Sequence, residues 1–281
     1  MADAAPRHDL PQGMTRCLPP MAVHAVPQRD GGVTVWREAG AGPTLVLLHG
    51  GSGAWTHWVA NIAALAGRHR LLIPDMPGYG TSDGPPETVE EMADEIAHGV
   101  GALTRPDEPV ALVGFSFGSL VAALTARRLD RPLRRLVLVG PGGLGGPTSR
   151  ALPMRPWRKL ADPRERYAAH RHNLLTLMLA REEKATPEAV AIHSAAVESA
   201  RFRSRHLSEE GRLRAVLAPG GLPLAAIWGG DDPLIRDDLE VRIEAVRAAD
   251  PGAPVQVIPG AGHWVPYEAP EAFHEALSGV L

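Results

Sequence analysis

The chain alternates short, almost wholly apolar runs with longer stretches in which apolar residues recur at helical spacing. The short runs have the length of strands and end at glycine, proline or aspartate. This pattern is typical of strands that are buried on both faces of a sheet. The predicted strands are 44–50, 69–75, 109–114, 133–140, 222–229 and 253–260.

Helical spacing follows most of these strands. Residues 89–103 carry acidic side chains early, which favours the N-terminus of a helix. Further helices are predicted at 117–129, 235–248 and 270–281. Such alternation of strand and helix predicts an α/β fold with a mostly parallel central sheet and helices on both faces.

One long interval interrupts this alternation. From residue 141 to residue 219 there is no strand pattern, only arginine-rich helical spacing with several prolines. We interpret 141–219 as a helical cap inserted over the strand ends. The α/β core is then 21–140 and 220–281, and residues 1–20, rich in proline, alanine and charge, are predicted to form a flexible N-terminal arm.

Composition narrows the class of protein. With 281 residues and 44% hydrophobic content, the chain can bury a sizeable core. The net charge of −3 gives no reason to expect a nucleic-acid partner. Cys17 is the only cysteine, so no internal disulfide can form. With no secretory pattern and no apolar run near the roughly 18–20 residues of a membrane span, we expect a cytoplasmic protein without a membrane partner.

The first chemical motif is Gly114-Phe115-Ser116-Phe117-Gly118, which matches G-x-S-x-G between a predicted strand and a predicted helix. The glycines permit a turn that is too sharp for residues with a Cβ. Ser116 is then strained, with its hydroxyl projecting from the turn. The backbone N–H of Phe117 points into the same space, so Ser116 is the predicted nucleophile.

A serine hydroxyl needs an adjacent base, and histidine suits that role because its ordinary pKa is about 6.5. His263 follows the last predicted strand and a glycine turn. The base in turn needs a carboxylate to hold its tautomer. Asp231 and Asp232 both follow the strand that ends near Trp228, and their spacing leaves open which one turns inward while the other caps a helix.

Attack on a carbonyl creates an oxyanion, which needs preorganised donors worth about 3–4 kcal/mol each. The stretch LLHGGSGAWTHW at 47–58 puts a glycine-rich loop after the first strong strand, where a backbone N–H can approach closely. Gly51 is the first candidate donor and Ser52 the second. The alternative of a phosphate-binding loop lacks the required glycine and lysine spacing.

Together, HGG, DMPGYGTSD, GFSFG, WGGDD and GAGHW resemble the signatures of the α/β-hydrolase fold family, in that family's order and over about 33–281. The resemblance implies Asp232 rather than Asp231 as the acid, and Gly51 and Phe117 as oxyanion-hole donors. It implies a structural role for the turn at 75–82 and a lid at 141–219. The predicted substrate-binding residues adjoin these groups and are Ser52, Phe115 and Trp264.

The function this implies is a serine hydrolase that cleaves a small or medium ester-like carbonyl in a small-molecule substrate, with no metal and no organic cofactor. Epoxide hydrolases and haloalkane dehalogenases carry aspartate where this chain has Ser116, so those chemistries are disfavoured. The sequence leaves the oligomeric state open, with a homodimer among the alternatives.

Two other functions remain as alternatives. Carbon–carbon bond hydrolases that act on meta-cleavage-type dienoates have a similar glycine-rich loop followed by aromatic residues, but they commonly have asparagine where this chain has Phe115. In such enzymes a lid arginine binds the dienoate carboxylate, and the candidates here are Arg201, Arg203 and Arg205. The last alternative is a non-catalytic ligand receptor on the same fold.

Overall fold

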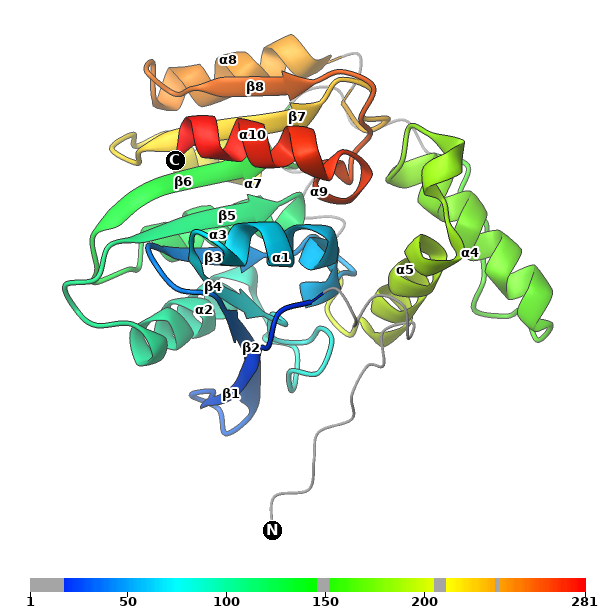
Figure 1. Ribbon diagram of the computed structural model, residues 1–281, viewed down its shortest axis with the longest axis horizontal. Coiled ribbons are helices and arrows are strands. Elements are labelled where there is room, and N and C mark those ends of the chain that lie inside the picture. Colours follow the sequence, from blue (N-terminus) through cyan, green and yellow to red (C-terminus); the bar gives the residue numbers. More distant parts are fainter. Residues whose placement is uncertain (1–17, 146–151, 205–210, 236–237) are drawn as a thin grey trace.

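The computed structural model describes residues 18–145, 152–204, 211–235 and 238–281, which fold around an eight-stranded sheet (Figure 1). The strand order is β1-β2-β4-β3-β5-β6-β7-β8. Strands β3 to β8 are mutually parallel, whereas β1 and β2 pair antiparallel with each other and β2 with β4. The strands are β1 Ala22–Pro27, β2 Val33–Ala39, β3 Thr44–Leu48, β4 Arg70–Pro74, β5 Val110–Phe115, β6 Leu133–Val139, β7 Leu224–Gly229 and β8 Val255–Ile258. The predicted mostly parallel sheet is confirmed.

Strands β1 and β2 were not predicted from the sequence. They form a hairpin at the edge of the sheet, and most of β1 is exposed or only partly buried. An antiparallel edge strand needs apolar residues on one face alone, so it lacks the continuous apolar run that marks the inner strands. The predicted N-terminal arm falls largely on residues 1–17, which lie outside the described residues, as does Cys17.

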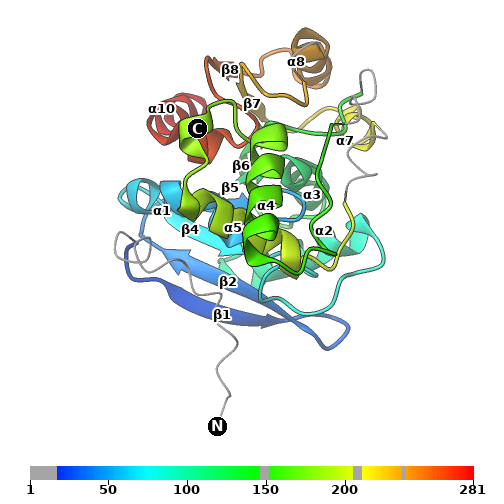
Figure 2. The same ribbon diagram turned by 90° about the vertical axis from the view of Figure 1, so that its right-hand side faces the viewer.

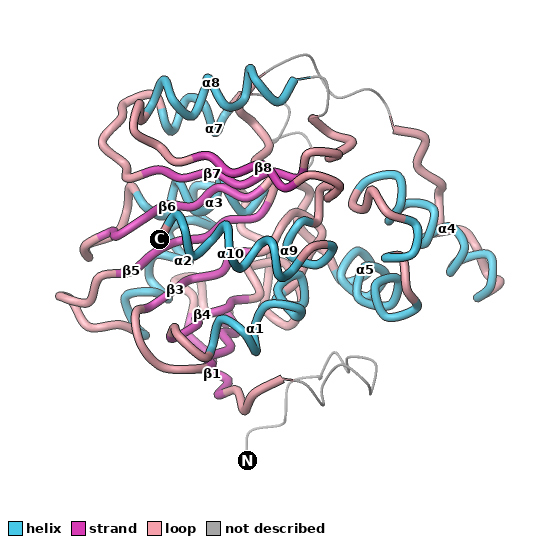
Figure 3. Tube along the Cα trace, turned by 45° about the horizontal axis from the view of Figure 1, so that its top comes forward, coloured by secondary structure: helices cyan, strands magenta, loops and turns pink. Residues whose placement is uncertain are grey.

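Helices cover both faces of the sheet because successive strand residues point to opposite sides. In β3, Leu45 and Leu47 face one core cluster and Val46 and Leu48 the other, and all four are fully buried. The first cluster lies under α1, α9 and α10, and the second under α2, α3, α7 and α8 (Figures 1 and 3). These helices are α1 Val59–Ala66, α2 Val89–Leu103, α3 Phe117–Ala126, α7 Arg212–Leu217, α8 Leu239–Ala249, α9 Val265–Glu268 and α10 Pro270–Val280. Within the described ranges, no helix is long and apolar enough to span a membrane.

The segment between β6 and β7 supplies a pair of helices that stand outside these layers. They are α4 Pro163–Leu177 and α5 Pro187–Ser199, joined through the short η3 Glu182–Lys184. Both helices begin with proline at the first turn, capped by the side chains of Asp162 and Thr186, which explains why the prolines of this segment do not break them. The pair lies beyond the carboxyl ends of the strands, in front of the sheet in Figure 2. The last helix of the segment, α7, packs instead on α3.

A buried carboxylate ties α4 to the chain that follows β8. The side chain of Glu268 is fully buried. It accepts hydrogen bonds from the backbone N–H groups of Ala180 (3.0 Å), Arg181 (2.7 Å) and Gly262 (2.6 Å). One side chain therefore joins the connection between α4 and α5 to the loop that carries His263.

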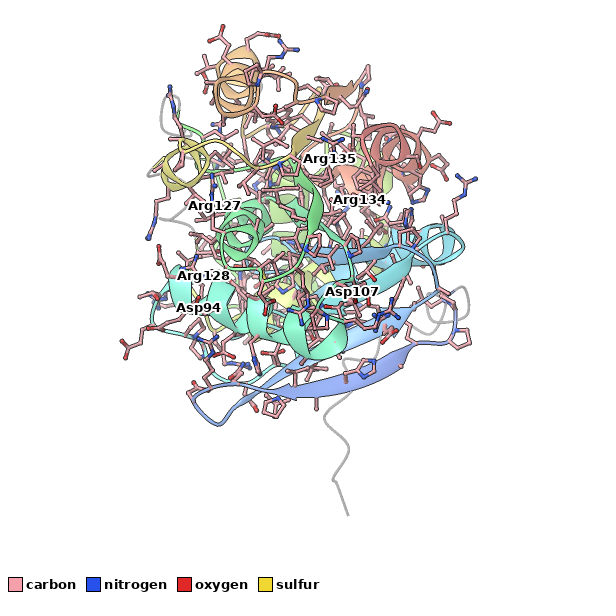
Figure 4. All side chains as sticks on the ribbon, turned by 90° about the vertical axis from the view of Figure 1, so that its left-hand side faces the viewer. Asp94, Asp107, Arg127, Arg128, Arg134 and Arg135 are labelled. Carbon is pink, nitrogen blue, oxygen red and sulfur yellow. The ribbon has the colours of Figure 1, made fainter. Side chains whose placement is uncertain are left out.

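At the opposite end of the sheet, charged side chains form ion pairs and hydrogen bonds near the ends of helices. Arg127 and Arg128 lie at the C-terminus of α3 (Figure 4). Arg128 pairs with Asp94 of α2, and a guanidinium nitrogen of Arg127 donates to the carbonyl of Gly220 at 2.8 Å. Cations are favourable at this end of a helix because its carbonyls carry partial negative charge. These charges therefore have a structural explanation.

We predict that Glu268→Ala lowers the free energy of unfolding by about 2–4 kcal/mol, because three backbone N–H groups lose the buried carboxylate that accepts their hydrogen bonds. Glu268→Gln, which keeps one acceptor oxygen, is expected to lose less. Urea unfolding followed by circular dichroism measures both. The exposed Glu275→Ala in α10 serves as the control and should stay within about 0.5 kcal/mol of wild type; an equal loss in Glu268→Ala and this control would contradict the assignment.

Candidate active site

A sharp turn between β5 and α3 presents the hydroxyl of Ser116. The residue has φ 53° and ψ −118°, a backbone conformation that side-chain-bearing residues rarely adopt. A Cβ on Gly114 would lie 2.3 Å from the carbonyl oxygen of Gly118, and one on Gly118 would lie 2.4 Å from that of His49. Both flanking positions therefore require glycine, which is the physical content of the G-x-S-x-G motif.

The structure brings the predicted nucleophile, base and acid into one chain of hydrogen bonds, which we call the Ser–His–Asp chain. Ser116 Oγ lies 2.9 Å from His263 Nε2, and His263 Nδ1 lies 2.6 Å from Asp232 Oδ2. Because the Asp232 carboxylate can only accept, Nδ1 carries the proton and Nε2 is free to accept the serine hydroxyl. His263 and Asp232 are buried, whereas Ser116 is partly exposed, so the hydroxyl is the reachable end of the chain.

Of the two adjacent aspartates, it is Asp232 that meets His263. Its second oxygen accepts the backbone N–H of Leu234 at 2.8 Å, which fixes the plane of the carboxylate. The backbone N–H of Asp231 donates to the carbonyl of Ala261 at 2.9 Å, which holds the turn that carries both residues. Spacing alone left this choice open.

The predicted oxyanion-hole donors lie beside the Ser116 turn. A Cβ on Gly51 would lie 3.4 Å from Phe117 Cβ, and one on Gly50 would lie 3.3 Å from Ser116 Cβ. The N–H of Phe117, at the first position of α3, is one of the helical N–H groups without a partner inside the helix. Two backbone donors beside one hydroxyl can stabilise negative charge on an oxygen bound there.

Sequence reasoning did not identify Phe202 and Ser204, which lie in the stretch that follows α5 and contact this loop and its surroundings. A Cβ on Gly51 would lie 2.2 Å from Ser204 Oγ, so that serine is in close contact with the glycine. Phe202 stacks on Phe117 with ring centroids 5.9 Å apart and approaches Tyr79 at 6.1 Å. Nothing in the local sequence marks these residues, because their partners are far away along the chain.

The candidate lid arginines lie elsewhere. Arg201 donates to the carbonyl of Ser82, and Arg201 and Arg203 line a cavity of about 430 Å³ at the start of α2. Phe202 borders this cavity and stacks on Phe117, so its ring lies between the cavity and the Ser116 turn. Arg205 lies outside the described residues.

The predicted substrate-binding residues differ in their surroundings. Ser52 adopts φ 50° next to Gly51. The ring of Phe115 is buried and lies 5.1 Å from that of His263. Trp264 is fully buried and donates its Nε1–H to the carbonyl of His57 at 2.9 Å. Both rings pack around imidazoles, and contact with a substrate stays a prediction for all three residues.

Several histidines near the Ser–His–Asp chain are buried in neutral form. Burial lowers the pKa of His49 and, more strongly, that of His57. In α5, burial lowers the pKa of His193 to about 4, and the neighbouring His170 adds to this effect. Near pH 7 these imidazoles are therefore uncharged, with one nitrogen donating and the other accepting.

Known proteins resemble this chain in sequence and in fold. A sequence profile described as "Alpha/beta hydrolase family" matches residues 45–276. A 2-hydroxy-6-oxo-6-phenylhexa-2,4-dienoate hydrolase of Burkholderia cepacia is 25% identical over 265 residues, 84% of this chain and 87% of that protein. A 2-hydroxymuconate semialdehyde hydrolase of Pseudomonas sp. (strain CF600) is 36% identical over 119 residues, only 41% of this chain and 42% of that protein. The crystal structure of an esterase from Rhodococcus sp. ECU1013 has a TM-score of 0.72 at 23% identity, covering 92% of this chain and 98% of that one, and so has the same fold.

The two aspartates offer a matched pair of variants. We predict that Asp232→Asn slows labelling of Ser116 by a fluorophosphonate about 10³- to 10⁴-fold, because the amide no longer holds the His263 tautomer. Asp231→Asn, the same change one residue earlier, should label within about threefold of wild type. Labelling rates measured by intact-protein mass spectrometry would contradict the assignment if Asp231→Asn were the slower variant.

The buried His193 predicts a stability change with pH. Its folded-state pKa of about 4 lies below the ordinary 6.5, so the unfolded chain binds the extra proton and stability falls as pH drops from about 6.5 towards 4. His193→Gln should therefore reduce the loss of unfolding free energy between about pH 7 and pH 5 by about 2 kcal/mol. Urea unfolding at both pH values tests this, with the exposed His98→Gln as the control. If the free energy of unfolding of His193→Gln fell by as much between the two pH values as that of wild type, the prediction would be wrong.

Proposed function

Because this chain belongs to the alpha/beta hydrolase family, we propose that it is a serine hydrolase that cleaves a small or medium ester-like carbonyl substrate. The observation that supports this most directly is the Ser–His–Asp chain, with 2.9 Å from serine to imidazole and 2.6 Å from imidazole to carboxylate. Both distances lie within the range required of a nucleophile, its base and the group that orients the base.

In the first half of the proposed reaction, Ser116 Oγ attacks the carbonyl carbon while its proton passes to His263 Nε2. The Asp232 carboxylate stabilises the imidazolium that forms. The carbonyl oxygen becomes an oxyanion, which accepts hydrogen bonds from the backbone N–H groups of Phe117 and Gly51. His263 then gives its proton to the leaving oxygen, the carbon–oxygen bond breaks, and an alcohol departs from the acyl-enzyme.

In the second half, a water molecule takes the place of the alcohol. His263 removes its proton as the water oxygen attacks the acyl carbon, and the same backbone donors stabilise the second oxyanion. Collapse returns the proton to Ser116 Oγ and releases the carboxylic acid. Nucleophile, base and donors all belong to the chain, so the proposed reaction calls for a small-molecule substrate and no metal or organic cofactor.

We propose that residues 141–219 serve as the cap of this site through α4 and α5. Their position beyond the strand ends supports this role (Figure 2). So does the contact of Glu268 with Ala180 and Arg181, because it joins the helical pair to the His263 loop. A cap held by this contact would form the wall of the substrate pocket that lies next to His263.

A second candidate is cleavage of a carbon–carbon bond in a vinylogous diketo acid. The names of the curated relatives in Burkholderia cepacia and Pseudomonas favour it. The same residues would act, with the leaving group a carbanion stabilised by conjugation instead of an alkoxide. The apolar Phe115 beside the nucleophile and the bond from Arg201 to Ser82 favour the ester reaction, because neither offers a partner for a dienoate carboxylate at the Ser116 turn.

One comparison separates the two candidates. The kcat/KM of purified protein is measured for a series of p-nitrophenyl esters from acetate to octanoate and for a coloured ring-cleavage dienoate. We expect the esters to be the better substrates. A dienoate kcat/KM at least about tenfold above that of every ester would favour the second candidate. Wild-type protein that neither turns over any substrate nor reacts with a fluorophosphonate would favour the non-catalytic receptor.

We predict that Ser116→Ala lowers kcat for p-nitrophenyl butyrate by at least about 10⁴-fold while the circular dichroism spectrum stays that of wild type. The reason is that no other group in the Ser–His–Asp chain can form the acyl bond. The exposed Ser278→Ala in α10 is the matched control and should keep full activity. Turnover retained in Ser116→Ala would refute the assignment of the nucleophile.

A further inference from the structure

Two imidazoles bond the backbone of Gly50 in the glycine-rich loop, residues 49–53. His49 Nδ1 lies 2.8 Å from the carbonyl oxygen of Gly50, and the N–H of Gly50 lies 3.2 Å from His57 Nδ1. One histidine directly precedes the glycine and the other follows seven residues later. Both polar groups of Gly50 are thus bonded to histidine side chains.

The partners of these rings fix their tautomers. The backbone N–H of Met76 donates to His49 Nε2 at 3.0 Å, so the proton of His49 is on Nδ1 and is donated to Gly50 O. The N–H of Gly50 needs a lone pair on His57 Nδ1, so the proton of His57 is on Nε2. Burial lowers the pKa of both rings, which keeps these neutral forms near pH 7.

The two bonds fix two successive peptide planes, because the Gly50 N–H belongs to the His49–Gly50 peptide and the Gly50 carbonyl to the Gly50–Gly51 peptide. In a trans peptide the C=O of Gly50 and the N–H of Gly51 point in opposite directions. The bond from His49 draws the carbonyl towards its ring and so turns the Gly51 N–H away from it. Two consecutive glycines have no side chains to restrict this peptide, so its orientation depends on the hydrogen bonds of the Gly50 carbonyl. That carbonyl accepts the backbone N–H of Gly53 at 3.2 Å as well as the bond from His49.

The position of His57 is itself fixed by aromatic residues around the Ser–His–Asp chain. Its ring lies 5.4 Å from that of Phe115 and 5.2 Å from that of Trp264. Its carbonyl accepts the Nε1–H of Trp264, the residue that follows His263. The imidazole is therefore immobilised by the shell that also contacts the candidate base.

We propose that His49 and His57 are positioning residues that fix the two peptides of Gly50, His49 through the Gly50 carbonyl and His57 through the Gly50 N–H, so that the Gly51 N–H is preorganised to receive the oxyanion; this rests on the proposed function. We call these two hydrogen bonds the Gly50 lock. A donor aimed in advance at the developing charge costs no reorganisation in the transition state. Loss of these hydrogen bonds leaves substrate binding intact and weakens stabilisation of the transition state. It therefore lowers kcat and leaves KM unchanged.

Two variants separate this role from simple packing. His57→Phe keeps an aromatic ring between Phe115 and Trp264 but removes the acceptor. His57→Asn removes the ring but places an amide oxygen near the position of Nδ1. The lock predicts that the asparagine variant is the more active of the two, whereas a packing role predicts the reverse order.

The expected result for His57→Phe with p-nitrophenyl butyrate is a fall in kcat of about 10- to 100-fold with KM within about threefold of wild type. For His57→Asn we expect kcat within about fivefold of wild type despite a lower thermal midpoint. The surface variant His98→Phe, in α2, controls for the substitution and should match wild type. His57→Phe with wild-type kcat would overturn the proposal.

A transition-state analogue gives a second readout. An aryl trifluoromethyl ketone adds to Ser116 Oγ and forms a hemiketal oxyanion, so its Ki in His57→Phe should rise by the factor by which kcat/KM falls. The Ki of butyrate, which carries no such oxyanion adduct, should not change. Equal shifts for both inhibitors would indicate a general distortion of the site and would overturn the lock.

Two further outcomes are possible, a His57→Phe variant that does not fold and a wild-type protein that is inactive. If His57→Phe does not fold, His49→Leu and His49→Asn make the same comparison at the Gly50 carbonyl, with asparagine keeping a donor and expected to be the more active. Equal activity of these two would overturn the proposal. Wild-type protein that is inactive towards esters and dienoates and unlabelled by a fluorophosphonate would overturn the proposed function, an outcome distinct from any difference among the variants.

Discussion

The strained backbone of Ser116 is the constraint around which the site is arranged. Holding a residue at φ 53° costs on the order of 1–3 kcal/mol, so the surroundings must fix it firmly. The N–H of Ser116 donates to Val139 of β6 at 2.8 Å, and the hydroxyl of Ser119 donates to Gly114 at 2.7 Å. The fully buried β5 on one side and α3 on the other leave the turn no room to relax.

Parallel pairing explains how groups so far apart in sequence meet at that turn. The glycine-rich loop follows β3, Ser116 follows β5, Asp232 follows β7 and His263 follows β8. Because these strands run in the same direction, their carboxyl ends open on one edge of the sheet, where ligands bind in α/β folds. The helical pair α4–α5 lies over this edge (Figure 1). Arg127 and Arg128, at the opposite end of the sheet, lie at the C-terminus of α3 (Figure 4).

The loop after β8 connects several of these features. It carries His263, its Trp264 bonds the carbonyl of His57, and its Gly262 N–H donates to Glu268. The candidate base, a contact of the proposed Gly50 lock and the hydrogen bond from Gly262 to Glu268 therefore lie in or next to one short segment. The neutral forms of His49 and His57 suit these buried surroundings, because a buried charge without a partner would cost far more than a polar ring with hydrogen-bond partners.

The sequence by itself determined the features that depend on local pattern. Runs of apolar residues identified the inner strands β3 to β7 because a strand covered on both faces must be largely apolar. The paired glycines identified the Ser116 turn because each position excludes a Cβ. His263 could be selected among twelve histidines because it follows a strand and a glycine turn in the expected order.

The spacing left Asp231 and Asp232 open and the family resemblance implied Asp232, but only the tertiary structure showed how their turn directs that side chain and what each buried ring bonds. Asp231 and Asp232 are chemically identical, and the backbone of their turn, held by Ala261 and Leu234, directs the second towards His263. The tautomer of His57 depends on the N–H of Gly50, and the direction of Arg201 on the carbonyl of Ser82. The proton positions and hydrogen-bond partners of these buried rings depend on groups distant along the chain, and no local pattern encodes them.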